Sequence, residues 1–488
     1  MKSLAALLLG GMLVVATGCL DIAGDVSEVS QASLAGEVSS FEQMVALYGD
    51  RNLLANGVRV ANDTGLATTV SSTGAIDLNN AFFQDLGFNG QRCVSCHIPS
   101  EGWSITPKQL EKTFDDTSGG VFDDGLGLGA VFRTNDGANS PDADVSTKTA
   151  RREAYSMLLN KGLIRVGLPI SDSAEFELLA VDDPYHFASA AELSLFRRPL
   201  PTTNLNLLST VMWDGREVVV PNASVASELE TQANSAVQGY TLGRPLTAAQ
   251  RGSIAQFELT LATAQVYDNQ AKDLNADGAL GGPEEILAQE FYIGINDNFG
   301  DSKTGAPFNP DVFTIFNAWT NVDNAQAAAR QAIARGQALF NTKPIAITGV
   351  SGINDEAVFG KPAVLIGSCT TCHNTPNGGS HSVVALLDIG LSDASRRTPD
   401  LPLYTLRNKT TGETVQVTDP GRALIDGKWN HIGRFKAPTL RGLALRAPFF
   451  HNGFAKDLDA VVDFYDARFH VGFTSAERSD LVAFLGSL

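Results

Sequence analysis

The chain has 488 residues, of which 54 are acidic and 36 basic, and its formal net charge at pH 7 is −18. Because no basic tract interrupts this acidity, the composition argues against nucleic acid as a partner. No run after the first 40 residues is long and apolar enough to span a bilayer, and those later residues suffice for two or three domains of ordinary size.

The start of the chain is predicted to be an export signal. A short positive segment precedes an apolar run over residues 4–15, and residues 16–19 (A-T-G-C) resemble the cleavage box of a bacterial lipoprotein. We expect a signal peptide over 1–18, a lipid on Cys19 and a flexible tether over 19–40; a plain secretory signal is the alternative. The protein should then lie in the periplasm or cell envelope, anchored to a membrane through the lipid alone.

One motif occurs twice and organises the chain. Residues 93–97 read C-V-S-C-H and residues 369–373 read C-T-T-C-H. C-x-x-C-H is the attachment pattern of c-type haem, in which both thiols form thioethers and the histidine binds the iron from one face. A redox dithiol or half a zinc site is the alternative, but two copies on an exported chain make it a poor explanation. We predict two covalent haems, attached through Cys93, Cys96, His97, Cys369, Cys372 and His373.

Between the two motifs the chain is rich in loop signals. Residues 107–200 contain many Gly, Asp and Pro residues and are predicted to be an insertion over the first haem domain, with one helix over 147–163. A second helix is expected from 224 to 239. Gln232 lies on its apolar face, where it is either a satisfied core amide or a group aimed at a ligand.

Residues 273–284 match the calcium-binding pattern D-x-N-x-D-G-x5-E. The motif places oxygen ligands before and after a sharp turn, and we expect helices over 254–265 and 285–292 to flank it. Turns rich in Asp, Asn and Gly imitate this loop, so calcium and a simple turn both remain open. The candidate ligands are Asp273, Asn275, Asp277 and Glu284.

The C-terminal part is predicted to be helical. An Ala-rich helix is expected over 324–340, and a later helix should carry Leu458 and Tyr465 on one apolar face. A capping box at 474–477 predicts the start of the last helix.

These patterns predict a mainly α-helical fold, because no long alternating strand run is apparent. Two cytochrome c-like domains are expected, over residues 41–322 and 323–488. The first would carry the long loop-rich insertion and the calcium-like loop, and the haems would face a shared interface.

In combination, the motifs resemble the bacterial dihaem cytochrome c peroxidases. The wider family includes the methylamine dehydrogenase maturation enzyme and, more distantly, the haem rubber oxygenases. The resemblance covers the haem segments and most of the C-terminal half, but neither the insertion nor the tether. It rests on both C-x-x-C-H motifs, W-D-G-R at 213–216, F-K-A-P-T-L-R at 435–441 and A-P-F-F-H-N-G at 447–453.

The resemblance implies a division of labour between the haems. The haem at His97 would react with hydrogen peroxide or dioxygen, and the haem at His373 would receive electrons from a small donor protein such as a cytochrome or cupredoxin. Trp213 matches a tryptophan that lies between the haems, and Gln232 matches an active-site glutamine. The acid–base glutamate of the family is missing, because its position falls at Leu242 with no carboxylate nearby.

The distal iron ligands depart from the peroxidases as well. Those enzymes use a methionine on the electron-transfer haem, but no Met follows Met212. The matching position is Tyr465, as in the maturation enzyme, and His451 is the rival ligand. No His lies between His97 and His186, so we expect the first iron to keep an open position.

Three classes of function follow. The leading one is an exported dihaem oxidoreductase that reduces hydrogen peroxide at the N-terminal haem with electrons relayed through the C-terminal haem. The alternatives are a dihaem oxygenase or protein-modifying enzyme that acts on an organic substrate, and a non-catalytic electron-transfer cytochrome. An open iron favours an enzyme, whereas the missing glutamate favours the oxygenase class over the peroxidase.

Overall fold

The computed structural model describes residues 37–218 and 224–488. The expected signal peptide, Cys19 and most of the tether therefore lie outside the described residues. Strand β1 (Glu37–Val38) already pairs in parallel with β4 (Arg59–Asn62), and Val38 is buried, so the ordered fold begins inside the segment expected to be a tether.

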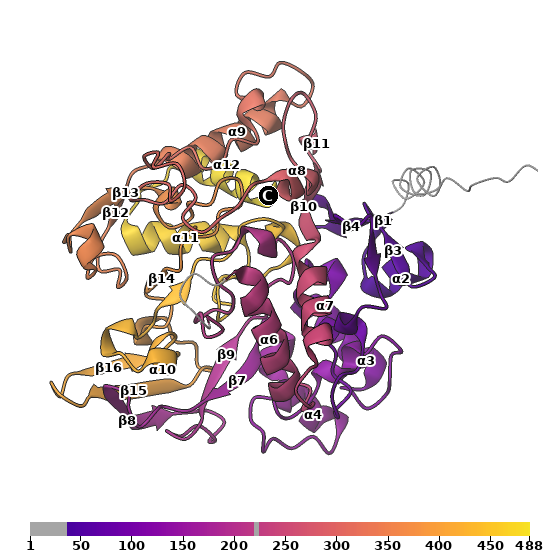
Figure 1. Cartoon of the computed structure of the whole chain (residues 1–488), viewed down its shortest axis with the longest axis vertical. Helices are drawn as coiled ribbons and strands as arrows, with labels where there is room; N and C mark the ends of the chain where they lie inside the picture. The colour runs from indigo at the N-terminus through magenta and orange to yellow at the C-terminus, as the bar shows by residue number, and fades with distance from the viewer. Residues whose placement is uncertain (1–36, 219–223) are drawn as a thin grey trace, which may run out of the picture.

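The fold is mixed α/β, and the prediction of a mainly α-helical protein was wrong. Helices account for 32% of the residues and strands for 18%, in several sheets (Figure 1). The largest sheet has the order β1-β4-β5-β10-β11, with β5 (Gly65–Ser71) antiparallel to β10 (Leu261–Asp268). Every residue of β5 is buried, and a strand buried on both faces shows no alternation of apolar and polar residues. Both strands are also rich in Ala and Thr, which made them harder to recognise as strands in the sequence.

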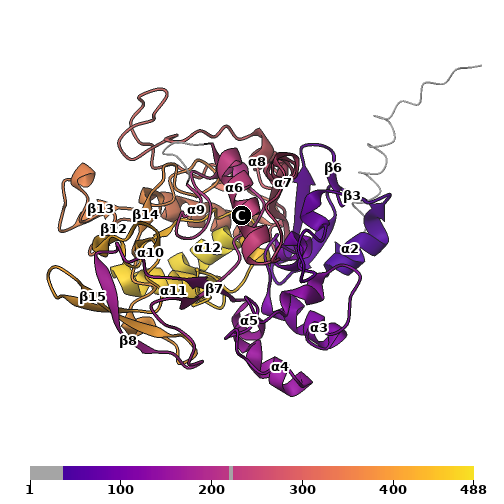
Figure 2. The same ribbon diagram turned by 60° about the horizontal axis from the view of Figure 1, so that its bottom comes forward.

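The segment 107–200 contains regular structure and joins the two halves of the chain. The single helix expected over 147–163 is two short helices that meet at Tyr155. Strand β8 in this segment pairs with β15 of the C-terminal half, and their sheet lies on the opposite side of the molecule from α2 and α3 in both views (Figure 2). The elements are α3 (Pro107–Thr117), α4 (Lys148–Ala154), α5 (Ser156–Lys161), β7 (Ile164–Leu168), β8 (Phe176–Asp182), β9 (Leu193–Arg197), β15 (Leu403–Asn408) and β16 (Thr414–Val417).

Several helices are where the sequence placed them. The helix expected over 224–239 is α6, which Ser224 caps. The capping box is also present, since Thr474 and Glu477 bond reciprocally to each other's backbone N–H groups. Gly336 is required where α9 crosses α12, because a Cβ there would collide with the carbonyl oxygen of Asp480. The bounds are α6 (Val225–Gly239), α9 (Ala327–Thr342), α11 (Leu458–Phe469) and α12 (Ser475–Gly486).

The helix expected over 254–265 is wrong in its second half. Helix α7 (Ala248–Leu259) ends at Leu259, and the chain continues as strand β10 from Leu261. The remaining elements are short: α2 (Phe41–Tyr48), β2 (Gly49–Asp50), β3 (Leu53–Ala55), β6 (Ala75–Asp77), β11 (Lys272–Asp273), α8 (Glu284–Ala288), β12 (Ile345–Ile347), β13 (Leu365–Gly367), β14 (Leu386–Leu387), α10 (Ala423–Asp426) and β17 (Phe435–Lys436). No helix in the described part of the chain has the length and apolar character needed to cross a membrane.

A buried ion network ties the insertion to the rest of the fold. Arg197, at the end of β9, forms a bidentate pair with Asp419 at 2.7 and 2.9 Å and also pairs with Asp214. Arg216 contacts the same Asp214 carboxylate at 3.0 Å. Because Arg197, Asp214 and Asp419 are all almost completely buried, each charge depends on its partners for compensation.

Candidate functional site

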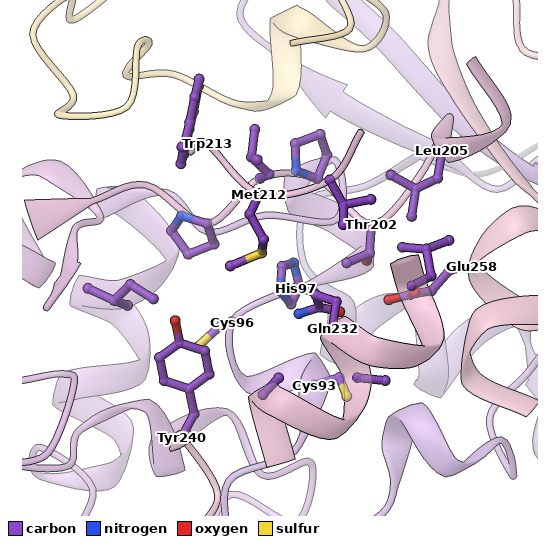
Figure 3. Close-up of a pocket in the computed structure, with 18 of the residues that line it drawn as sticks. Cys93, Cys96, His97, Thr202, Leu205, Met212, Trp213, Gln232, Tyr240 and Glu258 are labelled. Atoms are coloured by element: carbon purple, nitrogen blue, oxygen red, sulfur yellow. The ribbon is translucent and has the colours of Figure 1, made fainter. Parts of the chain in front are cut away.

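The first C-x-x-C-H motif opens onto an apolar cavity. Cys93 begins the short 3-10 helix η3 (Cys93–Ser95), and the backbone N–H of His97 returns to the carbonyl of Cys93, which closes the turn. Cys93, Cys96 and His97 line a cavity with about 1290 Å³ of space free of protein atoms, part of it open to solvent (Figure 3). Helices α6 and α7 and residues 197–202 supply much of the remaining wall.

His97 is oriented by its backbone surroundings. Its Nδ1 lies 3.1 Å from the carbonyl oxygen of Trp103, which leaves Nε2 free to bind a metal. Burial lowers the pKa of the imidazole to about 4, so the ring is neutral at pH 7, as ligation requires. Trp103 is itself fixed, since its indole N–H donates to Thr69 at 3.0 Å.

The second motif has the same local design. Cys369, Cys372 and His373 line another cavity, with about 1700 Å³ of space free of protein atoms. The Nδ1 of His373 bonds to the carbonyl of Gly379, and burial lowers the pKa of this imidazole to about 4. Both histidines therefore present Nε2 in the neutral form.

Two candidate distal ligands share the second cavity. Tyr465 projects from α11, and burial raises the pKa of its phenol. His451 stacks on Phe435 with ring centroids 3.9 Å apart, and its Nδ1 has no hydrogen-bond partner within the described structure. Its Nε2 lies 3.4 Å from the hydroxyl of Ser392. Both residues are within the cavity wall, so the preference for Tyr465 over His451 stays a prediction.

The two cavities share a wall. Trp213 lines both of them, as the resemblance implies for a tryptophan between the haems, and its indole N–H donates to the carbonyl of Arg198 at 2.8 Å. Arg198 and Lys436 also line both cavities.

The two cations of this wall suit a bound group that carries carboxylates. Arg198 donates to four backbone carbonyls, and Lys436 donates to the carbonyl of Thr210 at 2.9 Å. Neither forms an ion pair with any residue in the part of the chain described, although both are buried. Burial lowers the pKa of Lys436 to about 7. Because haem carries two propionates, these cations and the paired thiols fit haem c at each motif.

Helix α6 brings a predicted residue into the first cavity. Gln232 lines it together with Leu229, one turn earlier. Leu242, where the resemblance places a glutamate, is 49% exposed and lies outside the cavity wall. His186 does not line this cavity either.

Sequence reasoning missed three polar or sulfur-bearing residues of the first cavity. Met212 and Tyr240 point into it in Figure 3, and Glu258 approaches from α7. Met212 and Tyr240 carry atoms that can bind iron, so the open position expected at the first iron stays a prediction. The available signal was a glutamate next to Phe257 on the buried side of α7. An analysis of hydrophobic periodicity, however, treats a charged residue there as a break in the apolar pattern.

The calcium-like loop has a different environment from the one expected. Asp277 accepts hydrogen bonds from Arg330 and, at 2.8 Å, from Asn324, so protein donors already serve this carboxylate. Asp273 lies in strand β11, and Glu284 begins α8. Within residues 37–218 and 224–488, no three His, Cys, Asp or Glu side chains gather as a metal-binding group. Calcium binding by Asp273, Asn275, Asp277 and Glu284 stays a prediction.

The fold and its two cavities define a class: a mixed α/β protein with two C-x-x-C-H sites, each lining a cavity, and a wall that both cavities share. No family model matches the chain. Curated relatives are cytochrome-c peroxidases. IdrP2 of Denitromonas iodatirespirans is 32% identical over 133 residues (25% of this chain, 36% of the relative), and IdrP1 of Pseudomonas sp. (strain SCT) is 29% identical over 140 residues (25% and 36%).

A longer match extends the similarity. IdrP1 of D. iodatirespirans is 26% identical over 289 residues, which is 54% of this chain and 64% of the relative. The match thus spans about a third of the length of the first two relatives and less than two thirds of the third. All three relatives are named cytochrome-c peroxidases.

Solved structures add only weak likenesses. Hydrazine synthase of Kuenenia stuttgartiensis matches with 13% identity and a TM-score of 0.30, over 63% of this chain and 76% of that one. A MauG-like protein associated with microbial copper homeostasis matches with 14% identity and a TM-score of 0.29, over 62% and 77%. Scores this low carry no argument about fold or function.

Proposed function

We propose that the chain is an exported, lipid-anchored dihaem peroxidase. Hydrogen peroxide would be reduced at the site of His97, with electrons that enter at the site of His373. One observation carries the proposal: two separate C-x-x-C-H cavities meet at a wall that contains Trp213. The similarity to cytochrome-c peroxidases supports the same reaction class.

The chain's own residues would prepare both sites for catalysis. Thioethers to Cys93 and Cys96, and to Cys369 and Cys372, would hold the haems. When bound, haem supplies an iron that exchanges single electrons and can bind peroxide. The carbonyl of Trp103 holds the His97 ring in the tautomer that leaves Nε2 free. Apolar walls would exclude bulk water from both cavities.

The electron count explains why two centres are useful. Reduction of one hydrogen peroxide to two waters consumes two electrons and two protons, whereas a small cytochrome or cupredoxin donates one electron at a time. Trp213 lies in the wall that an electron would cross between the cavities. Arg198 and Lys436, in the same wall, would offset the negative charge of the propionates.

A turnover experiment tests the proposal. The purified diheme protein is mixed with a reduced small cytochrome and hydrogen peroxide without oxygen, and donor oxidation is followed by absorbance. We expect two donors to be oxidised for each peroxide consumed. Peroxide that persists with every reduced donor tried would rule out the peroxidase.

One observation keeps a second function open. Leu242 is exposed where the peroxidases carry their acid–base glutamate, and this favours an oxygenase or protein-modifying enzyme that acts on an organic substrate. Such an enzyme would oxidise an added organic or protein substrate with peroxide in the absence of a donor protein. A pure electron carrier would neither reduce peroxide nor oxidise an organic substrate.

The distal ligand of the second haem can be tested by substitution. Electron paramagnetic resonance of the ferric protein should show one high-spin centre, at His97, and one low-spin centre, at His373. Because Tyr465 lines the second cavity, Tyr465→Phe should change the low-spin signal and leave the high-spin one intact. The matched variant is His451→Ala; if it alone changes the low-spin signal, His451 is the ligand.

A further inference from the structure

Glu258 is a buried carboxyl group in the wall of the first cavity. It is 2% exposed, on the face of α7 that also buries Ile254 and Phe257. Its Oε2 has no hydrogen-bond partner among the residues that the structure describes. In Figure 3 the carboxyl group points toward the centre of the cavity, where His97 and Gln232 lie.

The surroundings of Glu258 differ from those of another buried glutamate, Glu228. Glu228, on α6, accepts a hydrogen bond from the backbone N–H of Val211 at 3.0 Å and does not line the cavity. Glu258 has no comparable donor and forms no ion pair in the described chain. A carboxylate without compensation is costly to bury, so the neutral, protonated form is favoured.

Charged neighbours do not reverse this preference. The titratable and charged groups that share the cavity are Arg92, Cys93, Cys96, His97, Arg197, Arg198, Arg216, Tyr240 and Lys436. Burial alone raises the pKa of Glu258 to about 8. At pH 7 the group therefore holds a proton and can release it in the range where acid–base catalysts work.

We propose that Glu258 is the acid–base residue of the first cavity. It would transfer the proton that the apolar side chain of Leu242 cannot transfer. The inference rests on the proposed peroxidase function. Overall, H₂O₂ + 2 H⁺ + 2 e⁻ gives two H₂O, with both electrons from the donor protein. Glu258 gives one proton to the peroxide oxygen that leaves as water when the O–O bond breaks, and it regains a proton from solvent. Glu258 lies 16 residues beyond Leu242, on helix α7, whereas Leu242 lies in the loop between α6 and α7.

The test compares Glu258→Gln with Glu258→Asp and with a matched control, Glu230→Gln. Glutamine keeps the size of the side chain but cannot give up a proton, aspartate keeps the carboxyl on a shorter stem, and Glu230 lies on α6 outside the cavity wall. Infrared spectra at pH 7 and pH 10 report the carbonyl stretch of a protonated carboxyl. Haem content and melting temperature are measured for every variant.

We expect the infrared band of the neutral carboxyl to be present at pH 7, to vanish at pH 10 and to be missing in Glu258→Gln. Peroxide reduction should fall about 10²–10⁴-fold in Glu258→Gln, recover in part in Glu258→Asp and stay unchanged in Glu230→Gln. The decline of the wild-type rate near pH 8 should disappear in Glu258→Gln.

The role of Glu258 and the proposed peroxidase function are contradicted by different outcomes. A wild-type rate and pH profile in Glu258→Gln, or infrared spectra of Glu258→Gln that are identical to those of the wild type, would overturn the role of Glu258 while the peroxidase stands. Wild-type protein that fails to reduce peroxide with any donor would instead remove the proposed function, and the role of Glu258 with it.

Discussion

A chain that carries Cys93→Ala together with Cys96→Ala is expected to keep one covalent haem and to lose peroxide reduction down to the background rate. The thioethers at the first motif cannot form without these thiols, whereas Cys369 and Cys372 line a separate cavity and should still attach their haem. Intact-protein mass spectrometry counts the haems, and peroxide-dependent oxidation of a reduced cytochrome gives the rate.

The reciprocal variant, Cys369→Ala with Cys372→Ala, is the matched control. It should also keep one haem, but it should lose the ability to oxidise the donor protein. Its remaining haem, reduced chemically, should still react with peroxide. The division of labour would be contradicted if this variant turned over donor and peroxide at the wild-type rate.

Asp214→Ala is expected to cost about 3–5 kcal/mol of the free energy of unfolding. The carboxylate of Asp214 is completely buried and contacts both Arg197 and Arg216, so its removal leaves the buried Arg197 and the partly buried Arg216 with less compensation. Denaturant unfolding monitored by circular dichroism measures the change. Asp182→Ala is the control, because that carboxylate pairs with Arg397 at the surface and its loss should matter little. Equal effects of both variants would contradict the argument.

The same carboxylate gives the stability a pH dependence. Arg197 and Arg216 outweigh burial and lower the pKa of Asp214 from 3.8 to about 2. Its contribution to stability is therefore complete above about pH 4 and is lost as the pH falls from about 4 to about 2. Asp214→Ala should show a smaller loss of stability over that interval than the wild type.

Local signals in the sequence predicted local structure well. Ser224 and the box at 474–477 fixed the starts of two helices, because a cap is read within a few residues. The strands failed for the opposite reason. Every residue of strand β5 is buried, and its partner β10 lies far away in sequence, as β15 does from β8. Neither pairing leaves a periodic pattern.

The candidate site was predicted in the same uneven way. Spacing alone indicated the attachment residues, since C-x-x-C-H is a local motif. The cavity around His97 is assembled from distant segments, and its buried carboxyl group comes from α7. Glu258 could not be predicted from its distance to Leu242 in the sequence. Helix α7 reaches the cavity only after the chain has turned between α6 and α7.

Several segments near the N-terminus pair with segments near the C-terminus, and this affects how the protein folds during synthesis. Synthesis delivers the chain from its N-terminus, yet β8 must wait for β15, and the first cavity must wait for Lys436 and Thr439. Pairings this distant along the chain form slowly. The cavity that holds the thiols of the first motif therefore stays incomplete until the last segment arrives. A fragment cut after residue 322 would lack part of its own cavity wall, so the two halves mature as one unit.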